Sequence, residues 1–100
     1  MAERGFEERV FAAFVQDGRL LSLPARRKKR LVILRWLADQ FRPAERYPES
    51  TVNDILRRHG EDVDSLRRYL VDEELMQRRS GLYWRAGTLP APAGSQRSPD

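Results

Sequence analysis

The sequence predicts a mainly α-helical domain with a small β-hairpin, arranged as a winged helix–turn–helix that an extra N-terminal helix precedes. Three observations lead to this class. Residues 3–15 and 25–41 show the apolar periodicity of amphipathic helices, two shorter helical segments meet at His59-Gly60, and two strand-like segments meet at Ser80-Gly81. A short glycine-containing junction between two helices, followed by a hairpin, is the order that this class requires.

The chain length and composition predict one domain. One hundred residues can build one modest core, and 40% of them are apolar. We expect a winged-helix-like domain over residues 1–86 and a disordered tail over residues 87–100, which contain three of the six prolines. No segment reaches the 18 consecutive apolar residues of a membrane span, and the charged N-terminus does not resemble a signal peptide. We therefore expect a cytoplasmic protein without membrane contact.

The first two helices are predicted from their apolar spacing. Phe6, Val10 and Phe14 recur every four residues and should form one face of a helix over residues 3–15, which ends before the turn signal Asp17-Gly18. Leu20 to Leu23 predict a brief strand or an extended arm that Pro24 stops. In the central helix, residues 25–41, the core side is expected to hold Leu31, Leu34, Leu37, Ala38 and Phe41, with Ile33 at its edge.

Val32 and Trp36 form a second apolar strip on the central helix. A helix with two apolar sides needs a second cover. The first helix is the expected cover, and a protein partner or a second copy of the chain in a homodimer is the alternative.

The remaining helices should be short. Tyr47-Pro48-Glu49-Ser50 is typical of a helix start and His59-Gly60 of a helix end, with His59 as a C-terminal cap. Asp62 is a predicted N-cap of the next helix. The segments 75–79 and 82–85 should pair as a hairpin. The expected core combines one hairpin aromatic, Tyr83 or Trp84, with Leu31, Leu34, Leu37, Phe41, Val52, Ile55, Leu56, Val63, Leu66 and Leu70.

The charge distribution favours a polyanionic partner. The net charge is +4, and residues 19–35 hold seven basic side chains and no acid. The densest run is Arg26, Arg27, Lys28, Lys29 and Arg30, at a predicted helix start where exposed amides also attract anions. The run is interpreted either as a phosphate site or as a solvated face neutralised by acids such as Glu45 or Glu49. The excess of 17 arginines over two lysines is attributed to a GC-rich genome, with bidentate phosphate recognition as the alternative.

The helix that follows Asp62 would enter the major groove of DNA. Arg68 and Ser65 project from its open face, whereas Arg67 lies at the margin of the core and is interpreted either as a DNA contact or as an ion-pair partner. Six acids between residues 61 and 74 oppose such a contact. On the hairpin, Arg78, Arg79 and Arg85 are interpreted as contacts to the DNA backbone or the minor groove, or as a charged edge that resists aggregation. One of Tyr83 and Trp84 should pack inward, with Trp84 either in the core or exposed to stack on bases.

Catalysis and cofactor chemistry find little support in the composition. The chain has no cysteine and a single histidine, His59, without a recognisable nucleophile motif. Asp62 and Asp64 are two positions apart and diverge on a helix, and no glycine-rich phosphate loop is present. We expect no enzymatic activity, no cofactor and no protein metal site.

Several motifs together resemble a bacterial family of domains of unknown function, DUF2087. They include Asp17-Gly18-Arg19-Leu20, Leu23-Pro24-Ala25, Lys28-Lys29-Arg30, Tyr47-Pro48-Glu49, Leu66-Arg67-Arg68-Tyr69-Leu70 and Tyr83-Trp84-Arg85. The resemblance covers most of the chain. It implies a regulatory setting, because members of that family stand alone or follow an ArsR-like helix–turn–helix in transcriptional regulators.

The resulting hypothesis is a nucleic-acid-binding module of the transcription-regulator type, with duplex DNA as the expected ligand. Its alternative is a winged helix used for protein contact, whose acidic helix after Asp62 docks on a basic partner. From the charge map, the run at residues 26–30 and the hairpin arginines should matter more than that helix.

Overall fold

The computed structural model describes residues 2–89, with side chains from Gly5 onward. It contains four helices and two small antiparallel sheets, so the strand content exceeds the single hairpin that the sequence predicts. The elements are α1 (Ala2–Phe14), β1 (Val15–Gln16), β2 (Arg19–Leu20), α2 (Arg27–Ala38), β3 (Tyr47–Pro48), α3 (Glu49–Arg57), α4 (Val63–Asp72), β4 (Met76–Arg79) and β5 (Leu82–Arg85).

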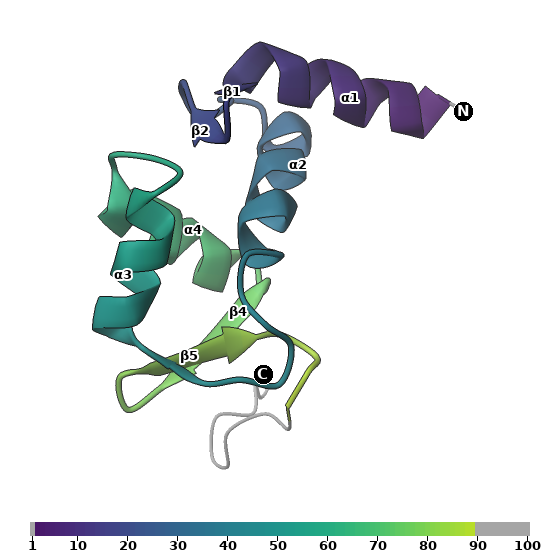
Figure 1. Cartoon of the computed structure of the whole chain (residues 1–100). Helices are drawn as coiled ribbons and strands as arrows, with labels where there is room; N and C mark the ends of the chain where they lie inside the picture. The colour runs from purple at the N-terminus through teal and green to yellow at the C-terminus, as the bar shows by residue number, and fades with distance from the viewer. Residues whose placement is uncertain (1, 90–100) are drawn as a thin grey trace.

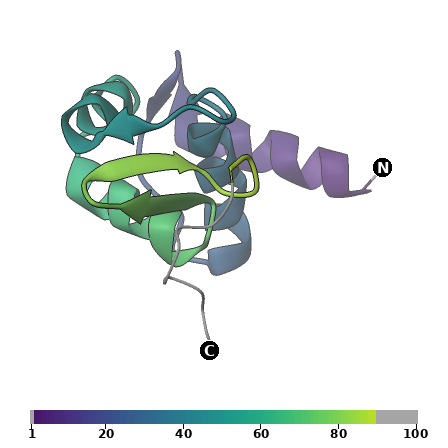
Figure 2. The same ribbon diagram turned by 90° about the horizontal axis from the view of Figure 1, so that it is seen from below.

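Helix α1 and the larger sheet lie at opposite ends of the molecule (Figure 1). Figure 1 shows α1 at one end and the β4–β5 hairpin at the other, with α2 running between them. Figure 2, seen from below, shows the hairpin in front of the helices. Helix α2 contacts both α1 and α4, and α3 packs against α4. The central helix therefore connects the N-terminal helix to the rest of the domain.

The predicted helices are present: α1 has the predicted length but lies one residue earlier, and the central helix is shorter than predicted. The central helix begins at Arg27 because Arg26 has an extended backbone (φ −77°, ψ 131°), and it ends at Ala38. Asp62 caps α4 as predicted, since its carboxylate accepts a 3.3 Å hydrogen bond from the Ser65 amide. Helix α3 ends at Arg57 with Arg58 as its C-cap, so the predicted cap at His59 is one residue too late, although the His59 amide still bonds to the Leu56 carbonyl. His59 thus helps to close the helix.

The predicted hairpin is confirmed, with Met76 opposite Arg85 and Arg79 opposite Leu82. Its turn residues Ser80 and Gly81 both have positive φ, 53° and 80°, which is the geometry that fits two-residue hairpin turns. The first strand begins one residue later than predicted, at Met76. Ser80-Gly81 was therefore a sufficient local signal for the turn.

Two strands, β1 and β3, were not predicted. Asp17 and Gly18, with φ of 54° and 77°, turn β1 into β2, so the predicted helix residue Val15 belongs to a strand. Of the expected strand over residues 20–23, only Leu20 is paired, together with Arg19 in β2. Strand β3 pairs with β5 through Tyr47 opposite Tyr83, which gives the sheet order β3-β5-β4.

The core agrees with the predicted set except at its margins. Leu34, Leu37, Leu56 and Leu70 are at most 1% exposed. Ile33 is fully buried instead of lying at an edge, because α2 is covered by α1 on one side and by α4 on another. The expected core residues Leu31 and Ile55 are half-buried and pack against the cluster.

Both hairpin aromatics are buried, where one was expected to be partly exposed. Tyr83 is 2% exposed and belongs to the main core, whereas Trp84 is 3% exposed and points to the other face of the sheet. On that face the Trp84 indole donates to Gln77 at 3.0 Å, and the Arg46 guanidinium lies 5.4 Å from its ring. Trp84 is therefore not an exposed stacking platform in this conformation.

The β1–β2 hairpin docks on the end of α3. The Leu20 amide donates to the His59 carbonyl at 2.6 Å, and Arg19 Nη1 donates to the carbonyls of Arg57 and Arg58 at 3.0 and 3.1 Å. His59 Nδ1 lies 2.8 Å from the Gly18 carbonyl, and its ring meets Trp36 edge-on at 5.0 Å. These bonds fix the hairpin beside the α3–α4 junction.

The part of the chain that the structure describes holds no helix with the length and apolar character needed to cross a bilayer.

Candidate nucleic-acid interface

The run of five cations lies at the start of α2, as predicted, but its members have different environments. Arg27 makes a bidentate ion pair with Glu73 just after α4, with contacts of 2.7, 3.0 and 3.1 Å. This hydrogen bond holds the pKa of Glu73 below its usual value and raises the pKa of Arg27. The neutralising acid is therefore Glu73 and not Glu45 or Glu49, because the fold brings the end of α4 to the start of α2.

Arg30 is also engaged within the protein. Its Nη1 donates to the Ala25 carbonyl at 2.7 Å, and its guanidinium lies 4.8 Å from the Tyr69 ring. The other three cations keep their charge without an acidic partner among the described residues: Arg26 is exposed, Lys28 lies 5.2 Å from the Phe6 ring, and Lys29 is half-buried. Arg26, Lys28 and Lys29 are therefore the members of the run that can bind an anion.

On α4, Arg67 is a structural residue in this conformation. Its side chain is 19% exposed, donates a short hydrogen bond to Asn53 of α3, and pairs with Asp64 at 3.2 Å. A longer ion pair of 3.9 Å joins it to Glu49 at the start of α3. This geometry agrees with the interpretation of Arg67 as an ion-pair partner, because its guanidinium joins α4 to α3.

Arg68 and Arg78 come together on one surface although they are ten residues apart. Arg68 on α4 and Arg78 on β4 are both exposed and line the same hollow of about 380 Å³. The Arg78 guanidinium lies 5.7 Å from the Tyr83 ring. The hollow is lined by three cations and three acids, which are Arg67, Arg68 and Arg78 and Glu49, Asp64 and Asp72.

The other predicted site residues, Arg85, Arg79 and Ser65, lie on different elements. Arg85 is half-buried and bonds to the Phe41 carbonyl at 3.3 Å and to Asp39 at 3.2 Å, so it fastens β5 to the end of α2. Arg79 is exposed on β4. Ser65 is half-buried and lines a hollow beside the β1–β2 hairpin, whereas Arg68 lines the hollow that Arg78 shares. The structure thus joins Arg68 with Arg78 but does not join either of them with Arg85.

Two groups of cations were not singled out from the sequence. Arg19, Arg57 and Arg58 meet where β2 reaches the end of α3, with Arg57 paired to Asp54 at 3.0 Å. Arg46 covers Trp84 on the outer face of the sheet. No local pattern identifies these groups, because each depends on segments that are distant in sequence.

Val32 and Trp36 are half-buried, and α1 is their cover, as expected. The Phe11 ring meets Trp36 edge-on at 5.1 Å. A shallow hollow of about 560 Å³ remains between α1 and α2, with Phe11, Ala12, Val32 and Trp36 as its apolar lining. A homodimer or a protein partner at this strip stays a prediction.

Within residues 2–89 no cluster of three or more His, Asp or Glu side chains is arranged to hold a metal ion. The arrangement instead offers exposed guanidinium and ammonium groups, which suit phosphate or carboxylate oxygens.

The fold and these cations define a small helical domain with a three-stranded sheet and arginine-rich surfaces. By sequence, the chain belongs to the family described as "Uncharacterized protein conserved in bacteria (DUF2087)", whose model matches residues 19–85. The match begins at β2 and ends at β5, so α1 and β1 lie outside it. No curated protein and no solved structure matches the chain.

Proposed function

We propose that this protein is a nucleic-acid-binding module of the winged helix–turn–helix type, with duplex DNA as its ligand and transcription regulation as its role. The order α2-β3-α3-α4-β4-β5, with β3 paired to β5, supports this proposal. In this interpretation α4 is the recognition helix, the five residues between α3 and α4 are the turn, and the β4–β5 hairpin is the wing.

The observation that carries the proposal is the shared surface of Arg68 and Arg78. A winged helix contacts DNA with its recognition helix and its wing at once, so cations of both elements must face the same side. Arg68 of α4 and Arg78 of β4 satisfy this condition by lining one hollow. Arg26 and Lys28 at the start of α2 add exposed positive charge for backbone contacts.

The experiment is a salt titration of binding to a fluorescein-labelled random DNA duplex. If the cations Arg26, Lys28, Arg68 and Arg78 each neutralise a phosphate, the logarithm of the binding constant falls with the logarithm of salt concentration with a slope of roughly −3 to −4. A single strand of the same sequence and the matching RNA duplex distinguish the three classes of nucleic acid. Absence of binding to the DNA duplex at low salt would contradict the proposal.

A second candidate function is protein contact by the same winged helix. It is favoured by the internal pairing of Arg27, Arg67 and Arg85 with Glu73, Asp64 and Asp39, which leaves fewer cations for phosphates. The exposed face of α4 also carries Asp64 and Asp72, which repel DNA and suit a basic partner. A salt response close to zero in the titration above favours this candidate.

A further inference from the structure

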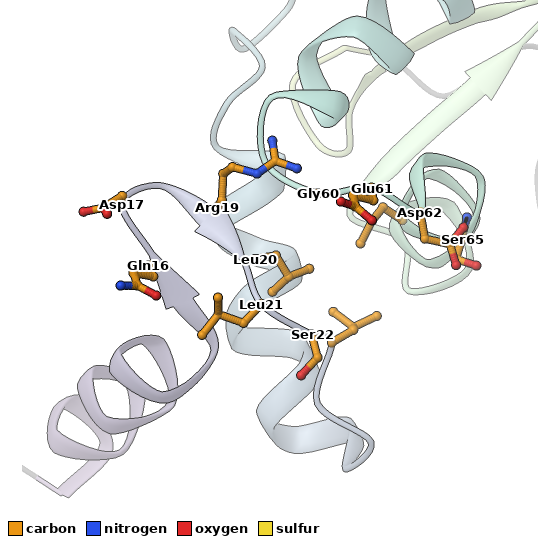
Figure 3. Close-up of a pocket in the computed structure, with 12 residues that line it drawn as sticks. Gln16, Asp17, Arg19, Leu20, Leu21, Ser22, Gly60, Glu61, Asp62 and Ser65 are labelled. Atoms are coloured by element: carbon orange, nitrogen blue, oxygen red, sulfur yellow. Dashed lines mark hydrogen bonds between the residues drawn. The ribbon is translucent and has the colours of Figure 1, made fainter.

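Another hollow of the described surface lies at the start of α4, beside the β1–β2 hairpin. It has a volume of about 630 Å³ and is enclosed by the β1–β2 hairpin, the segment that follows β2, and the α3–α4 junction. Figure 3 shows Leu20, Leu21 and Ser22 on one side of it and Gly60, Glu61, Asp62 and Ser65 on the other. A hollow of this size can accept one or two side chains.

Four leucines form the apolar part of the lining, and one of them is unusually exposed. Leu20, Leu23 and Leu66 contribute to the wall, and Leu21 beside them is 60% exposed, more than any other large apolar side chain of the described residues. A single exposed leucine is ordinary in a soluble protein, but one that extends an apolar hollow is typical of an interaction site.

The rim of the hollow is acidic. Asp17, Glu61 and Asp62 all line it and are all exposed. The opposing cation is Arg19, whose guanidinium already donates to the carbonyls of Arg57 and Arg58. The rim therefore carries an excess of negative charge, which repels phosphates and attracts a basic ligand.

The walls are fixed by backbone hydrogen bonds on both sides. The amides of Leu20 and Leu21 donate to the carbonyls of His59 and Phe14 at 2.6 and 2.7 Å. Gly60 lies so close to Leu66 that an added Cβ would stand 2.9 Å from the leucine Cδ1. These contacts hold the hollow in one shape before a ligand binds. Binding therefore does not include the entropic cost of ordering its walls.

We propose that this hollow, which we call the leucine hollow, binds a basic peptide segment of a partner protein. An aliphatic side chain of the segment packs on Leu20, Leu21 and Leu66, and neighbouring lysine or arginine side chains pair with Glu61 and Asp62. The apolar lining selects the aliphatic anchor, and the excess negative charge selects a cationic peptide over nucleic acid. None of the four cations proposed to contact DNA, Arg26, Lys28, Arg68 and Arg78, lines this hollow, so the two proposals can fail independently.

The test is a titration of the full-length ¹⁵N-labelled protein with the acetylated and amidated peptide Gly-Lys-Leu-Leu-Arg-Lys-Gly, followed by NMR. We expect saturable shifts of the amides of Ser22, Gly60 and Leu66 with a dissociation constant of about 1 mM or lower. A peptide with both leucines replaced by serine, and one with its basic residues replaced by glutamate, should each bind at least about tenfold more weakly.

Matched protein variants locate the site. Leu21→Ser should weaken peptide binding about tenfold, and Glu61→Gln about twofold to fivefold, whereas Leu82→Ser should leave it unchanged because this other exposed leucine lies on the hairpin. Leu21 and Glu61 are exposed, so both variants should keep the wild-type unfolding midpoint.

Three results would overturn the proposal. The first is the absence of shifts at these amides at peptide concentrations well above 1 mM. The second is equal binding by the Leu21→Ser variant and the wild type, or by the glutamate peptide and the basic one. The third is a DNA duplex that moves the same amides and displaces the peptide, which would assign the surface to nucleic acid.

Discussion

The hydroxyl of Tyr83 donates a 2.8 Å hydrogen bond to the carboxylate of Glu49, which joins β5 to the first turn of α3. The Glu49 amide also donates to the carbonyl of Gly81 at 3.1 Å, and Arg67 approaches the same carboxylate at 3.9 Å. Glu49 thus connects the hairpin, α3 and α4. Since these are the elements proposed to meet DNA, this contact sets their relative position.

The first prediction concerns the Tyr83 hydroxyl. Replacing it in Tyr83→Phe should cost about 0.5 to 1.5 kcal/mol of stability at neutral pH, because one hydrogen bond is lost and the ring remains. Burial first, and the bond to Glu49 second, raise the pKa of Tyr83 above its usual 10.0. A raised pKa gives stability that is complete below the unfolded-state pKa and is lost as the pH rises through the folded-state pKa.

Between about pH 9 and 11 the wild type should therefore lose more stability than Tyr83→Phe does. Urea unfolding at several pH values measures both effects. Equal losses in the two proteins would mean that Tyr83 titrates as it does in the unfolded chain.

The second prediction concerns the close approach at Gly60. Gly60→Ala places a Cβ 2.9 Å from Leu66 Cδ1, and overpacking of this kind should cost about 1 to 3 kcal/mol. The matched control is Gly5→Ala in α1, where the nearest atom is the flexible end of Arg9 at 3.3 Å. That change should stabilise the helix by about 0.5 to 1 kcal/mol. Thermal unfolding of both variants is the measurement, and an unchanged midpoint for Gly60→Ala would contradict the packing argument.

The third prediction separates the core from its margin. Leu34→Ala and Leu70→Ala should each cost about 2 to 5 kcal/mol, because both side chains are at most 1% exposed. Leu31→Ala should cost less, since Leu31 is half-buried on the same helix as Leu34. The urea unfolding midpoints of the three variants test this prediction. A Leu31→Ala variant as unstable as Leu34→Ala would place Leu31 inside the core after all.

The fourth prediction distinguishes the two basic surfaces in DNA binding. Because Arg27 is paired with Glu73, the run at the start of α2 is best neutralised by the triple variant Arg26→Ala, Lys28→Ala and Lys29→Ala. This variant should weaken binding to all sequences and flatten the salt slope by about two units, because Arg26 and Lys28 are the members of the run proposed to contact phosphates, whereas Arg68→Ala should flatten it by about one and change sequence preference.

The readout is binding of each variant to random and selected duplexes, with Arg57→Ala as a control for the loss of an exposed arginine on α3. If the triple variant binds like the wild type and Arg68→Ala abolishes binding, the run is a solvated helix face and α4 is the main contact.

The sequence by itself determined the helices and the hairpin turn, because their signals are local. The apolar spacing of Leu34, Leu37 and Ala38 marks one buried side of α2, and Asp62 caps α4 through an amide only three residues away. Ser80 and Gly81 adopt the positive φ that their turn requires. Each of these features depends on residues within one or two turns of the chain, so the pattern alone is informative.

Only the tertiary structure decided β3, the partners of the cations and the leucine hollow. Strand β3 has two residues, one of them a proline, and exists because β5 lies beside it. Arg27 meets Glu73 across 46 positions, and the hollow joins residues near 20 with residues near 60. The physical reason is the same in each case: these contacts form between segments that packing brings together, and charge or apolarity in one segment does not specify which other segment will meet it.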